Sequence, residues 1–369
     1  MKTSSREPVR YAVVGLGHIA QSVVLPGFQR AKGSVIGALI TGDPEKARKL
    51  SQKYGAPAFS YADYEKALRE EDIDAVYVAL PNTQHREFTV RAARAGVHVL
   101  CEKPMATSEK DCRAMIAACA RARVHLMIAY RLHFTDAELS AIKLAKSGKL
   151  GEIRYFSSVF GMQVASPNIR INAKDGGGPL YDLGVYCVNA ARYLFDAEPT
   201  EVFGYTASNK DPRFTETEEM ASALLRFPGD RLAAFTCSFG AVDSSVIELV
   251  GTKGILKVDP AYSYKEDMKW VVSIGGKKQR KTFPLGDQFG AEIAYFSACI
   301  RSGTKPEPDG YEGCADVRVL NAIFKAARSG RSVKIAPVKP QKRPRSSQVI
   351  KLRPTREPKL VKVKAPTKT

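Results

Sequence analysis

Short apolar segments alternate with amphipathic helical segments from residue 9 to residue 129 of this chain. The apolar, β-branched segments predict buried strands at 9–15, 34–41, 58–60, 75–80, 98–101 and 125–129. The segments between them predict helices at 19–31, 44–54, 63–70, 84–95 and 108–122. Because such crossovers return each strand parallel to the one before, the alternation predicts an α/β domain, a doubly wound parallel sheet covered on both faces.

The pattern changes after Arg131. Helices are expected at 136–147, 288–301 and 316–327, with a glycine-rich loop and helix at 176–195. The segments that alternate apolar and polar residues predict strands at 153–160, 201–208, 221–227, 231–239 and 246–250. Closely spaced strands of this kind predict an α+β domain over 131–335, with a largely antiparallel, open-faced sheet. If the open face is partly apolar, it favours a homodimer or homotetramer.

The net charge of +19 is concentrated at the C-terminus. Residues 339–369 hold eleven lysines and arginines, five prolines and a single acid, Glu357. This composition predicts a disordered basic tail over 336–369, suited to weak contact with nucleic acid. There is no apolar run long enough to cross a membrane and no signal-peptide pattern, so we expect a cytoplasmic protein. Seven cysteines without a Cys-x-x-Cys pair predict buried thiols, and no metal site is expected.

A phosphate-binding turn lies between the first strand and the first helix. Its sequence, Gly15-Leu16-Gly17-His18-Ile19-Ala20, matches Gly-x-Gly-x-x-Gly/Ala. Gly15 permits the tight turn, Gly17 lets the backbone approach a pyrophosphate, and Ala20 permits close packing of helix on strand. Residues 1–130 are therefore predicted to form a Rossmann domain that binds a dinucleotide, with Gly15, Gly17, His18 and Ile19 at the cofactor.

The end of the second strand favours NADP over NAD. Domains that bind NAD usually carry an acid there, on the ribose 2′-hydroxyl. Here Thr41 and Gly42 occupy that place, and Lys46 lies at the start of the next helix with Arg48 behind it. An uncharged hydrogen-bonding residue and nearby cations suit a 2′-phosphate. Asp43 comes two residues later and, preceding a proline, is expected to cap the helix.

Four further motifs follow the predicted strands or open a helix. They are Leu80-Pro81-Asn82-Thr83-Gln84-His85, Glu102-Lys103-Pro104, Tyr130-Arg131-Leu132-His133-Phe134 and Asp175-Gly176-Gly177-Gly178-Pro179-Leu180-Tyr181-Asp182-Leu183-Gly184-Val185-Tyr186. Together they resemble the Gfo/Idh/MocA oxidoreductases, in particular the branch that is similar to glucose-fructose oxidoreductase. The resemblance covers about residues 9–335.

The resemblance implies hydride transfer between a nicotinamide and a sugar, with Lys103, Tyr186 and Asp182 as the catalytic residues. Oxidation of a hydroxyl-bearing carbon needs a base for the hydroxyl proton, and a nearby ammonium favours the phenolate form of a tyrosine. The expected substrate contacts are Lys103, Arg170, Asp182 and Tyr186. The further cofactor contacts implied are Leu80, Pro81, Asn82, His85, Glu102, Lys103 and Arg131. As structural alternatives, Tyr186 is a packed aromatic, Asp182 a helix-face acid and His85 a helix-start residue.

Several functional alternatives stay open at this point. The reaction is either oxidation of an aldose at C1 to a lactone or reduction of a keto sugar, since the same residues serve both directions. About eight residues precede the first strand, too few for an arm over the nucleotide, so an exchangeable cofactor is expected. A second class is a non-catalytic regulator that senses NADP or a sugar and contacts nucleic acid through its tail. The joint presence of Lys103, Asp182 and Tyr186 favours the enzyme.

Overall fold

The computed structural model describes residues 7–338 and 343–367 and divides them into two compact units. Of these residues, the first unit takes 7–131, 286–314 and 350–365, and the second takes the rest. The sequence predicts three consecutive segments instead, 1–130, 131–335 and 336–369. Each unit is made of separate stretches of sequence, because residues 286–314 and 350–365 belong to the first unit although they follow most of the second. No local sequence pattern indicates such an arrangement.

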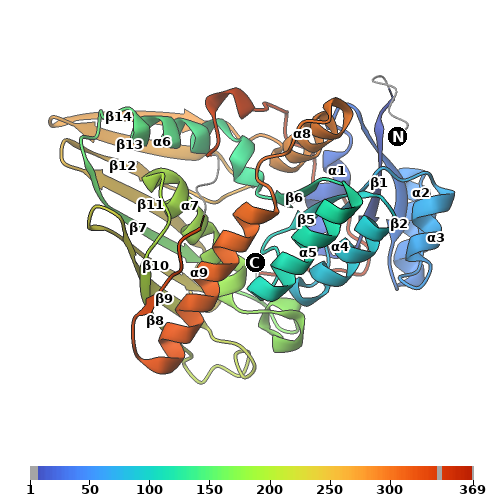
Figure 1. Ribbon diagram of the computed structural model, residues 1–369, viewed down its shortest axis with the longest axis horizontal. Coiled ribbons are helices and arrows are strands. Elements are labelled where there is room, and N and C mark those ends of the chain that lie inside the picture. The colour runs from blue at the N-terminus through green and yellow to red at the C-terminus, as the bar shows by residue number, and fades with distance from the viewer. Residues whose placement is uncertain (1–6, 339–342, 368–369) are drawn as a thin grey trace. The chain divides into compact units, whose positions relative to one another are not determined.

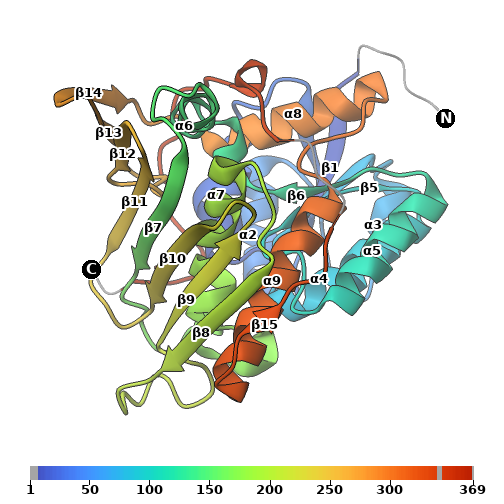
Figure 2. The same cartoon turned by 60° about the vertical axis from the view of Figure 1, so that its left-hand side comes forward.

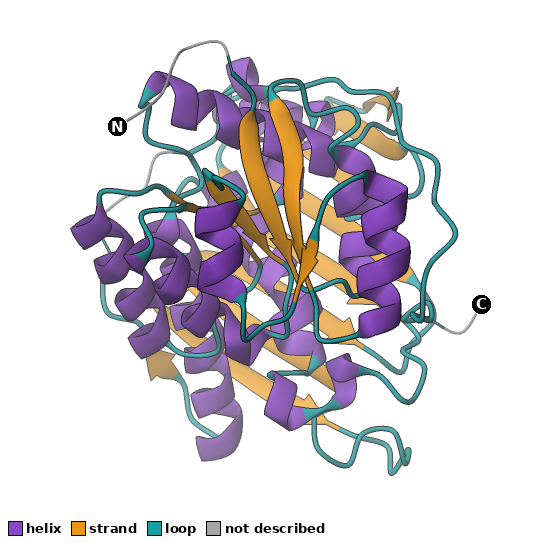
Figure 3. Ribbon diagram, turned by 90° about the vertical axis from the view of Figure 1, so that its right-hand side faces the viewer, coloured by secondary structure: helices purple, strands orange, loops and turns teal. Residues whose placement is uncertain are grey.

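The first unit is built on a parallel sheet of six described strands, in the order β3-β2-β1-β4-β5-β6. The strands are β1 (Val9–Val14), β2 (Ser34–Ile40), β3 (Ala58–Phe59), β4 (Ala75–Val78), β5 (His98–Glu102) and β6 (Leu126–Ala129). The helices are η1 (Ala20–Val24) with α1 (Leu25–Gly27), α2 (Pro44–Tyr54), α3 (Tyr64–Glu70), α4 (His85–Arg94), α5 (Glu109–Ala122) and α8 (Gln288–Ser302). Figures 1 and 3 show helices on both faces of this sheet, which confirms the predicted doubly wound fold.

Local signals begin and end the helices of this unit. Asp43 caps α2 as expected, because its Oδ1 accepts hydrogen bonds from the backbone N–H groups of Glu45 (2.9 Å) and Lys46 (3.0 Å). Gly55 ends the same helix with a φ of +66°, which glycine adopts at little cost. The loop between β2 and α2 is therefore fixed by short-range interactions that the sequence alone could indicate.

The second unit is built on nine described strands in the order β14-β13-β12-β11-β7-β10-β9-β8-β15, antiparallel except for the pair β7 and β10. They are β7 (Ile153–Gly161), β8 (Glu201–Ala207), β9 (Met220–Phe227), β10 (Arg231–Ser238), β11 (Ser244–Gly251), β12 (Gly254–Val258), β13 (Met268–Ile274), β14 (Lys277–Phe283) and β15 (Val333–Lys334). The helices are α6 (Asp136–Lys146), α7 (Val185–Phe195) and α9 (Gly310–Ser329), most of which belongs to this unit. The predicted largely antiparallel sheet is confirmed.

The strands β12 to β15 were not predicted from the sequence. Residues 277–282 of β14 are all exposed, and four of them are lysine or arginine. An edge strand of this kind carries charges that discourage pairing with another chain, so it lacks the apolar alternation by which strands are recognised.

One face of the sheet in the second unit is open. Helices α7 and α9 lie on the other face (Figure 2). Along β10, exposed Leu232 and Ala234 alternate with buried Ala233 and Phe235. The large apolar side chains exposed on β7, β9, β10 and β12 are Tyr155, Val159, Leu224, Leu232 and Ile255. The open-faced sheet that the sequence predicts is therefore present, with a partly apolar surface.

Part of the basic tail is packed, in place of the disordered segment that the sequence predicts. In the second unit, Arg343 is 8% exposed and donates a hydrogen bond to Oε1 of Glu198 (2.5 Å). In the first unit, Val361 pairs with the side chain of Gln21. The composition of the tail does not predict these contacts, because the partner residues lie more than a hundred residues away in sequence. Residues 339–342 and 368–369 of the tail lie outside the described residues.

All seven cysteines are buried, and none forms a disulfide. Among the described residues, no helix has the length and apolar character needed to cross a membrane.

Candidate active site

The turn Gly15-Leu16-Gly17 lies at the carboxyl end of β1. Gly15 has a φ of +90°, and a Cβ there would come within 2.6 Å of the carbonyl oxygen of Ala79, so a larger residue does not fit. At Gly17 an added Cβ would meet nothing within 4 Å, so the space at this residue is open. His18 and Ile19 are partly exposed beside it. This geometry suits the close approach of a dinucleotide pyrophosphate.

The end of β2 combines a buried hydroxyl with charged side chains. Thr41 is buried, and its Oγ1 accepts a hydrogen bond from the backbone N–H of Asp43 (3.3 Å). Gly42 is exposed, and Lys46 is partly buried with no ion pair among the described residues. The hydrogen bond from the Lys46 backbone lowers the pKa of Asp43, which is therefore ionised at neutral pH. The place expected to receive a ribose 2′-phosphate thus carries a carboxylate as well as a lysine.

His85 joins two loops at the carboxyl end of the sheet. Its Nδ1 lies 3.0 Å from the carbonyl oxygen of Pro104, and its Nε2 lies 2.9 Å from that of Leu80. The side chain is fully buried, and burial lowers the pKa of His85. His85 therefore holds the loop that carries Lys103 against the end of β4. A direct cofactor contact, which the resemblance implies for His85, does not fit this burial. Pro81 and Asn82 are partly exposed at the same edge.

A buried cluster of two carboxyl groups and a phenol adjoins the loop that carries Lys103. The Tyr77 hydroxyl lies 2.9 Å from Oε1 of Glu102 and 2.8 Å from Oε1 of Glu292. A phenol has one proton and donates to one carboxylate at a time, so the second contact requires a proton on the other carboxyl. Burial raises the pKa of Glu102 and, further, that of Glu292. The cluster therefore holds an extra proton, and Glu102 is tied to the backbone N–H of Lys103 (3.2 Å).

Arg131 belongs to the same buried cluster. Its side chain is 3% exposed, donates to Oε1 of Gln288 and interacts electrostatically with Glu102 and Glu292. The resemblance implies a cofactor contact for Arg131, but burial instead places the guanidinium among these carboxyl groups. Tyr77, Gln288 and Glu292 were not among the site residues predicted from the sequence. The one signal for Glu292 was an acid within the apolar face of α8.

The second unit brings its three predicted substrate contacts together. Asp182 lies in the π-helical turn η6 (Leu180–Gly184), and Tyr186 lies in the first turn of α7. Nε of Arg170 donates to Oδ2 of Asp182 at 2.7 Å, and both side chains are about one-fifth exposed. Arg170 also interacts electrostatically with Tyr264 and Tyr186. A donor, an acceptor and a phenol therefore share one partly accessible site.

Two acids hold the loop that carries Arg170 and the glycine turn that packs against it. Gly178 donates its backbone N–H to the carbonyl oxygen of Arg170 (2.7 Å). Glu216 accepts from the backbone N–H of Ala173 (3.1 Å), and Glu218 accepts from that of Leu180 (3.4 Å). Burial raises the pKa of Glu218 to about 7. Both acids come from the connection between β8 and β9, at residues 208–219.

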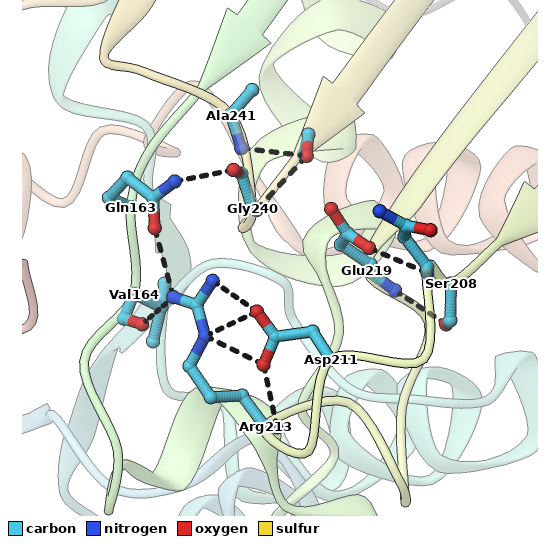
Figure 4. Close-up of polar contacts among 10 residues, drawn as sticks. Gln163, Val164, Ser208, Asp211, Arg213, Glu219, Gly240 and Ala241 are labelled. Carbon is cyan, nitrogen blue, oxygen red and sulfur yellow. Dashed lines mark hydrogen bonds and ion pairs between the residues drawn. The ribbon is translucent and has the colours of Figure 1, made fainter.

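A polar cluster around Arg213 anchors that connection (Figure 4). The guanidinium pairs with Asp211 (2.7 Å) and donates to the side chain of Gln163 (2.9 Å) and to the carbonyl oxygen of Val164 (2.6 Å). Gln163 in turn donates to the carbonyl oxygen of Gly240 (2.5 Å). These bonds tie residues 208–219 to the segments after β7 and β10. Glu216 therefore reaches the Arg170 loop, and Glu218 reaches the end of the glycine turn, from an anchored connection.

Two family models match the sequence. Residues 9–130 match an oxidoreductase family with an NAD-binding Rossmann fold, and residues 139–257 match the Gfo/Idh/MocA C-terminal domain. The chain belongs to the Gfo/Idh/MocA oxidoreductase family. This membership confirms the resemblance drawn from the motifs and the expectation of an oxidoreductase.

The chain is similar to related proteins over most of its length. An aldose-aldose oxidoreductase from Caulobacter crescentus is 38% identical, with a TM-score of 0.85 over 89% of this chain and 100% of that one. A 3-ketoreductase from Actinomadura kijaniata, solved with NADP and TDP-benzene, is 25% identical, with a TM-score of 0.80 over 87% and 98%. The D-xylose 1-dehydrogenase [NADP(+)] of Haloarcula marismortui is 28% identical over 90% of this chain and 95% of that protein.

Proposed function

We propose that this protein is an NADP-dependent sugar oxidoreductase that oxidises an aldose at C1 to a lactone, or reduces a keto sugar in the opposite direction. The observation that carries the proposal is the site of Arg170, Asp182 and Tyr186 at the start of α7. It offers a guanidinium and a carboxylate for sugar hydroxyls and a phenol for proton transfer. The similar proteins named for aldoses and D-xylose support a sugar as the substrate.

NADP is the favoured cofactor. The buried Thr41 and the nearby Lys46 offer a hydroxyl and a cation at the end of β2, where the ribose 2′-substituent is bound in Rossmann domains. The relative named for NADP(+) and the ketoreductase solved with NADP support the same choice. When bound, the nicotinamide supplies the hydride acceptor at its C4.

The proposal gives each site residue a separate task. Tyr186 takes the proton of the C1 hydroxyl as the C–H bond gives up its hydride. The family resemblance assigns Lys103 to the same reaction, in which its ammonium is proposed to orient the substrate hydroxyl. Asp182 and Arg170 form an ion pair, and in this proposal both bind the neighbouring sugar hydroxyls. The cluster of Tyr77, Glu102 and Glu292 positions Lys103 through Glu102.

A substrate panel tests the proposal. Purified protein is assayed with pentoses and hexoses, as aldoses and ketoses, with NADP+ and NADPH beside NAD+ and NADH. We expect turnover on at least one sugar, with kcat/KM at least tenfold higher for the NADP pair. Lys103→Met and Tyr186→Phe are expected to lower kcat about 100-fold or more. The Kd of NADPH should stay within about threefold, because neither side chain is needed to hold the phosphates.

Two neighbouring substitutions serve as controls. Lys110→Met changes an exposed lysine on α5, and Tyr181→Phe changes a tyrosine in the same turn as Asp182. Both should retain turnover. Unchanged turnover in both Lys103→Met and Tyr186→Phe would contradict the assignment.

We also propose that the open face of the sheet joins copies of the chain into a homodimer or homotetramer. The exposed apolar side chains there, among them Leu224 and Leu232, are the type of surface that association buries. Leu224→Glu should shift the mass measured by light scattering toward the monomer. A parent protein that is itself monomeric at micromolar concentration would contradict this assembly.

A further inference from the structure

The C-terminal segment 350–365 contacts the first unit next to the ends of β1 and β2, where a Rossmann domain binds the adenosine half of a dinucleotide. We propose that Lys362, carried by this segment, binds the ribose 2′-phosphate and sets the preference for NADP over NAD. The proposal rests on the proposed use of NADP and adds to it a specificity-determining residue from outside the Rossmann segment of the sequence.

A buried amide fastens the segment to the phosphate-binding turn. The backbone N–H of Val361 donates to Oε1 of Gln21 (2.7 Å), and Nε2 of Gln21 donates to the carbonyl oxygens of Val361 (3.0 Å) and Leu16 (2.9 Å). Gln21 is only 1% exposed. Without the segment, this buried amide would lose both of its bonds to Val361, and buried polar groups are rarely left unpaired. The segment is therefore a built part of the cofactor domain.

A second attachment fixes the upstream end of the segment. The carbonyl oxygen of Leu352 accepts a hydrogen bond from the backbone N–H of Asp287 (3.0 Å), the residue that caps α8. The chain between Leu352 and Val361 is thus held at both ends on the first unit, and Lys362 is held next to the second attachment.

Lys362 lies at the end of β2. Its Nζ is 3.2 Å from Oδ2 of Asp43 and 3.5 Å from Oε2 of Glu45. Asp43 uses its other carboxylate oxygen to cap α2, and its backbone N–H bonds to Thr41. The ammonium therefore pairs with a residue that is itself bonded to Thr41, which directly follows β2 at the place where the 2′-substituent is recognised.

The charges explain why a cation is needed at this place. A hydrogen bond from the Lys46 backbone lowers the pKa of Asp43, and a hydrogen bond from Lys49 lowers that of Glu45, so both carboxylates are ionised at neutral pH. Two carboxylates repel a nearby phosphate dianion. Lys362 faces both of them and so places a cation next to the position where the 2′-phosphate would bind.

The same charges would favour NAD without Lys362. A carboxylate at this place is the usual partner of an unphosphorylated ribose 2′-hydroxyl. Removing Lys362 should therefore weaken the binding of NADPH and leave that of NADH nearly unchanged, because NADH carries no phosphate there.

The test compares Lys362→Gln with the parent chain. Dissociation constants of NADPH and NADH are measured by nicotinamide fluorescence at constant ionic strength, and those of adenosine 2′,5′-bisphosphate and 5′-AMP by calorimetry. Lys359→Gln and Lys364→Gln are matched controls, because both lysines are exposed on the same segment. For Lys362→Gln we expect about tenfold weaker binding of NADPH and of the bisphosphate, with NADH and 5′-AMP within twofold. The two controls should change neither.

A second variant tests the placement of the segment without changing the charge of Lys362. Gln21→Ala removes the attachment to Val361 without touching the lysine, and it also removes the bond to Leu16 in the phosphate-binding turn, so it should weaken both cofactors but NADPH more than NADH. In the parent chain, NADPH should slow cleavage by trypsin after Lys362 more than NADH does.

The outcomes separate this inference from the proposed function. If the parent chain binds NADH as tightly as NADPH, both the proposed cofactor and the role of Lys362 fail. If the parent prefers NADPH and Lys362→Gln keeps that preference undiminished, the role of Lys362 alone is overturned. Equal weakening of both cofactors would also overturn it, since the contact would then not be with the 2′-phosphate.

Discussion

A glycine-rich turn leads into a π-helical turn in each unit, yet the two turns use glycine differently. In the first unit, Gly17 precedes η1, and a Cβ there would meet nothing within 4 Å. In the second unit, Gly177 precedes η6, and a Cβ there would come within 2.3 Å of the carbonyl oxygen of Arg170. The space beside Gly17 is open, whereas the space beside Gly177 is filled by the backbone of the Arg170 loop. π-Helical turns occur frequently at functional sites, and here each one follows the turn that shapes its site.

The difference shows that the same residue type can serve binding directly or through packing. The first turn would meet the cofactor with its own backbone. The second turn acts through the loop it carries, because close packing at Gly177 brings Arg170 to Asp182 (2.7 Å). Substitutions in the first turn should therefore affect ligand binding, and those in the second should affect stability and turnover.

The largest effect is expected from Gly177→Ala. The added methyl group meets backbone atoms, which cannot move aside as a flexible side chain can. The free energy of unfolding should fall by about 3 kcal/mol, and turnover should fall by more than tenfold because Arg170 is displaced from Asp182. Urea unfolding and steady-state kinetics measure the two quantities. A variant with parental stability would show that the loop yields, and the contrast with Gly17 would then be lost.

Glu218→Gln tests the acid that holds the second turn. Burial raises the pKa of Glu218 from 4.5 to about 7. The folded protein therefore binds a proton that the unfolded chain releases, and the stability that Glu218 contributes is fully present below pH 4.5 and is lost as the pH rises to about 7. In Glu218→Gln this loss should disappear, making the variant more stable than the parent at pH 8 by about 3 kcal/mol. Thermal unfolding from pH 4.5 to 8 measures the slope, and identical slopes in both proteins would refute the role of this carboxyl.

Gly17→Ala should separate binding from stability in the first turn. Because the space at Gly17 is open, the free energy of unfolding should change by less than about 0.5 kcal/mol. The methyl group occupies the place of the pyrophosphate, so NADPH binding should weaken by at least about tenfold, or about 1.4 kcal/mol. Fluorescence titration and thermal unfolding are the two measurements. Unaltered NADPH affinity would mean that the phosphates do not approach this residue.

The smallest effect is expected from Glu216→Gln, on the same connection as Glu218. Glu216 is exposed and accepts one hydrogen bond, from the Ala173 backbone (3.1 Å). A glutamine oxygen can still accept that bond, so stability should change by about 0.5 kcal/mol or less and show the parental dependence on pH. A large loss of stability in this variant would show that Glu216, and not Glu218, is the acid that anchors the loop.

Short-range patterns predicted much of this structure. The strand-helix alternation predicted the first sheet, the glycine spacing predicted the open turn at Gly17, and the Asp43-Pro44 pair predicted the start of α2. The four-residue spacing of Asp182 and Tyr186 predicted a shared site, and Arg170 interacts with both. Each of these features depends on residues close together in sequence.

The remainder depended on distant partners. His85 had the position of a ligand contact but is buried between two carbonyl oxygens. Glu292 joins Tyr77 across 215 residues of sequence. The tail had the composition of a disordered segment, yet Gln21 and Glu198 bind it. Composition measures average tendencies, whereas these outcomes each depend on one complementary partner.

The sequence by itself determined the two kinds of sheet, the phosphate-binding turn and the residue types of an oxidoreductase, because backbone propensity and apolar periodicity act locally. Only the tertiary structure decided how each glycine turn is used and which charged groups face one another. Whether space remains at Gly17 or is filled at Gly177 depends on segments that fold back from elsewhere in the chain. The placement of Lys362 beside Asp43 has the same origin, since burying an amide and pairing charges require partners that sequence proximity does not supply.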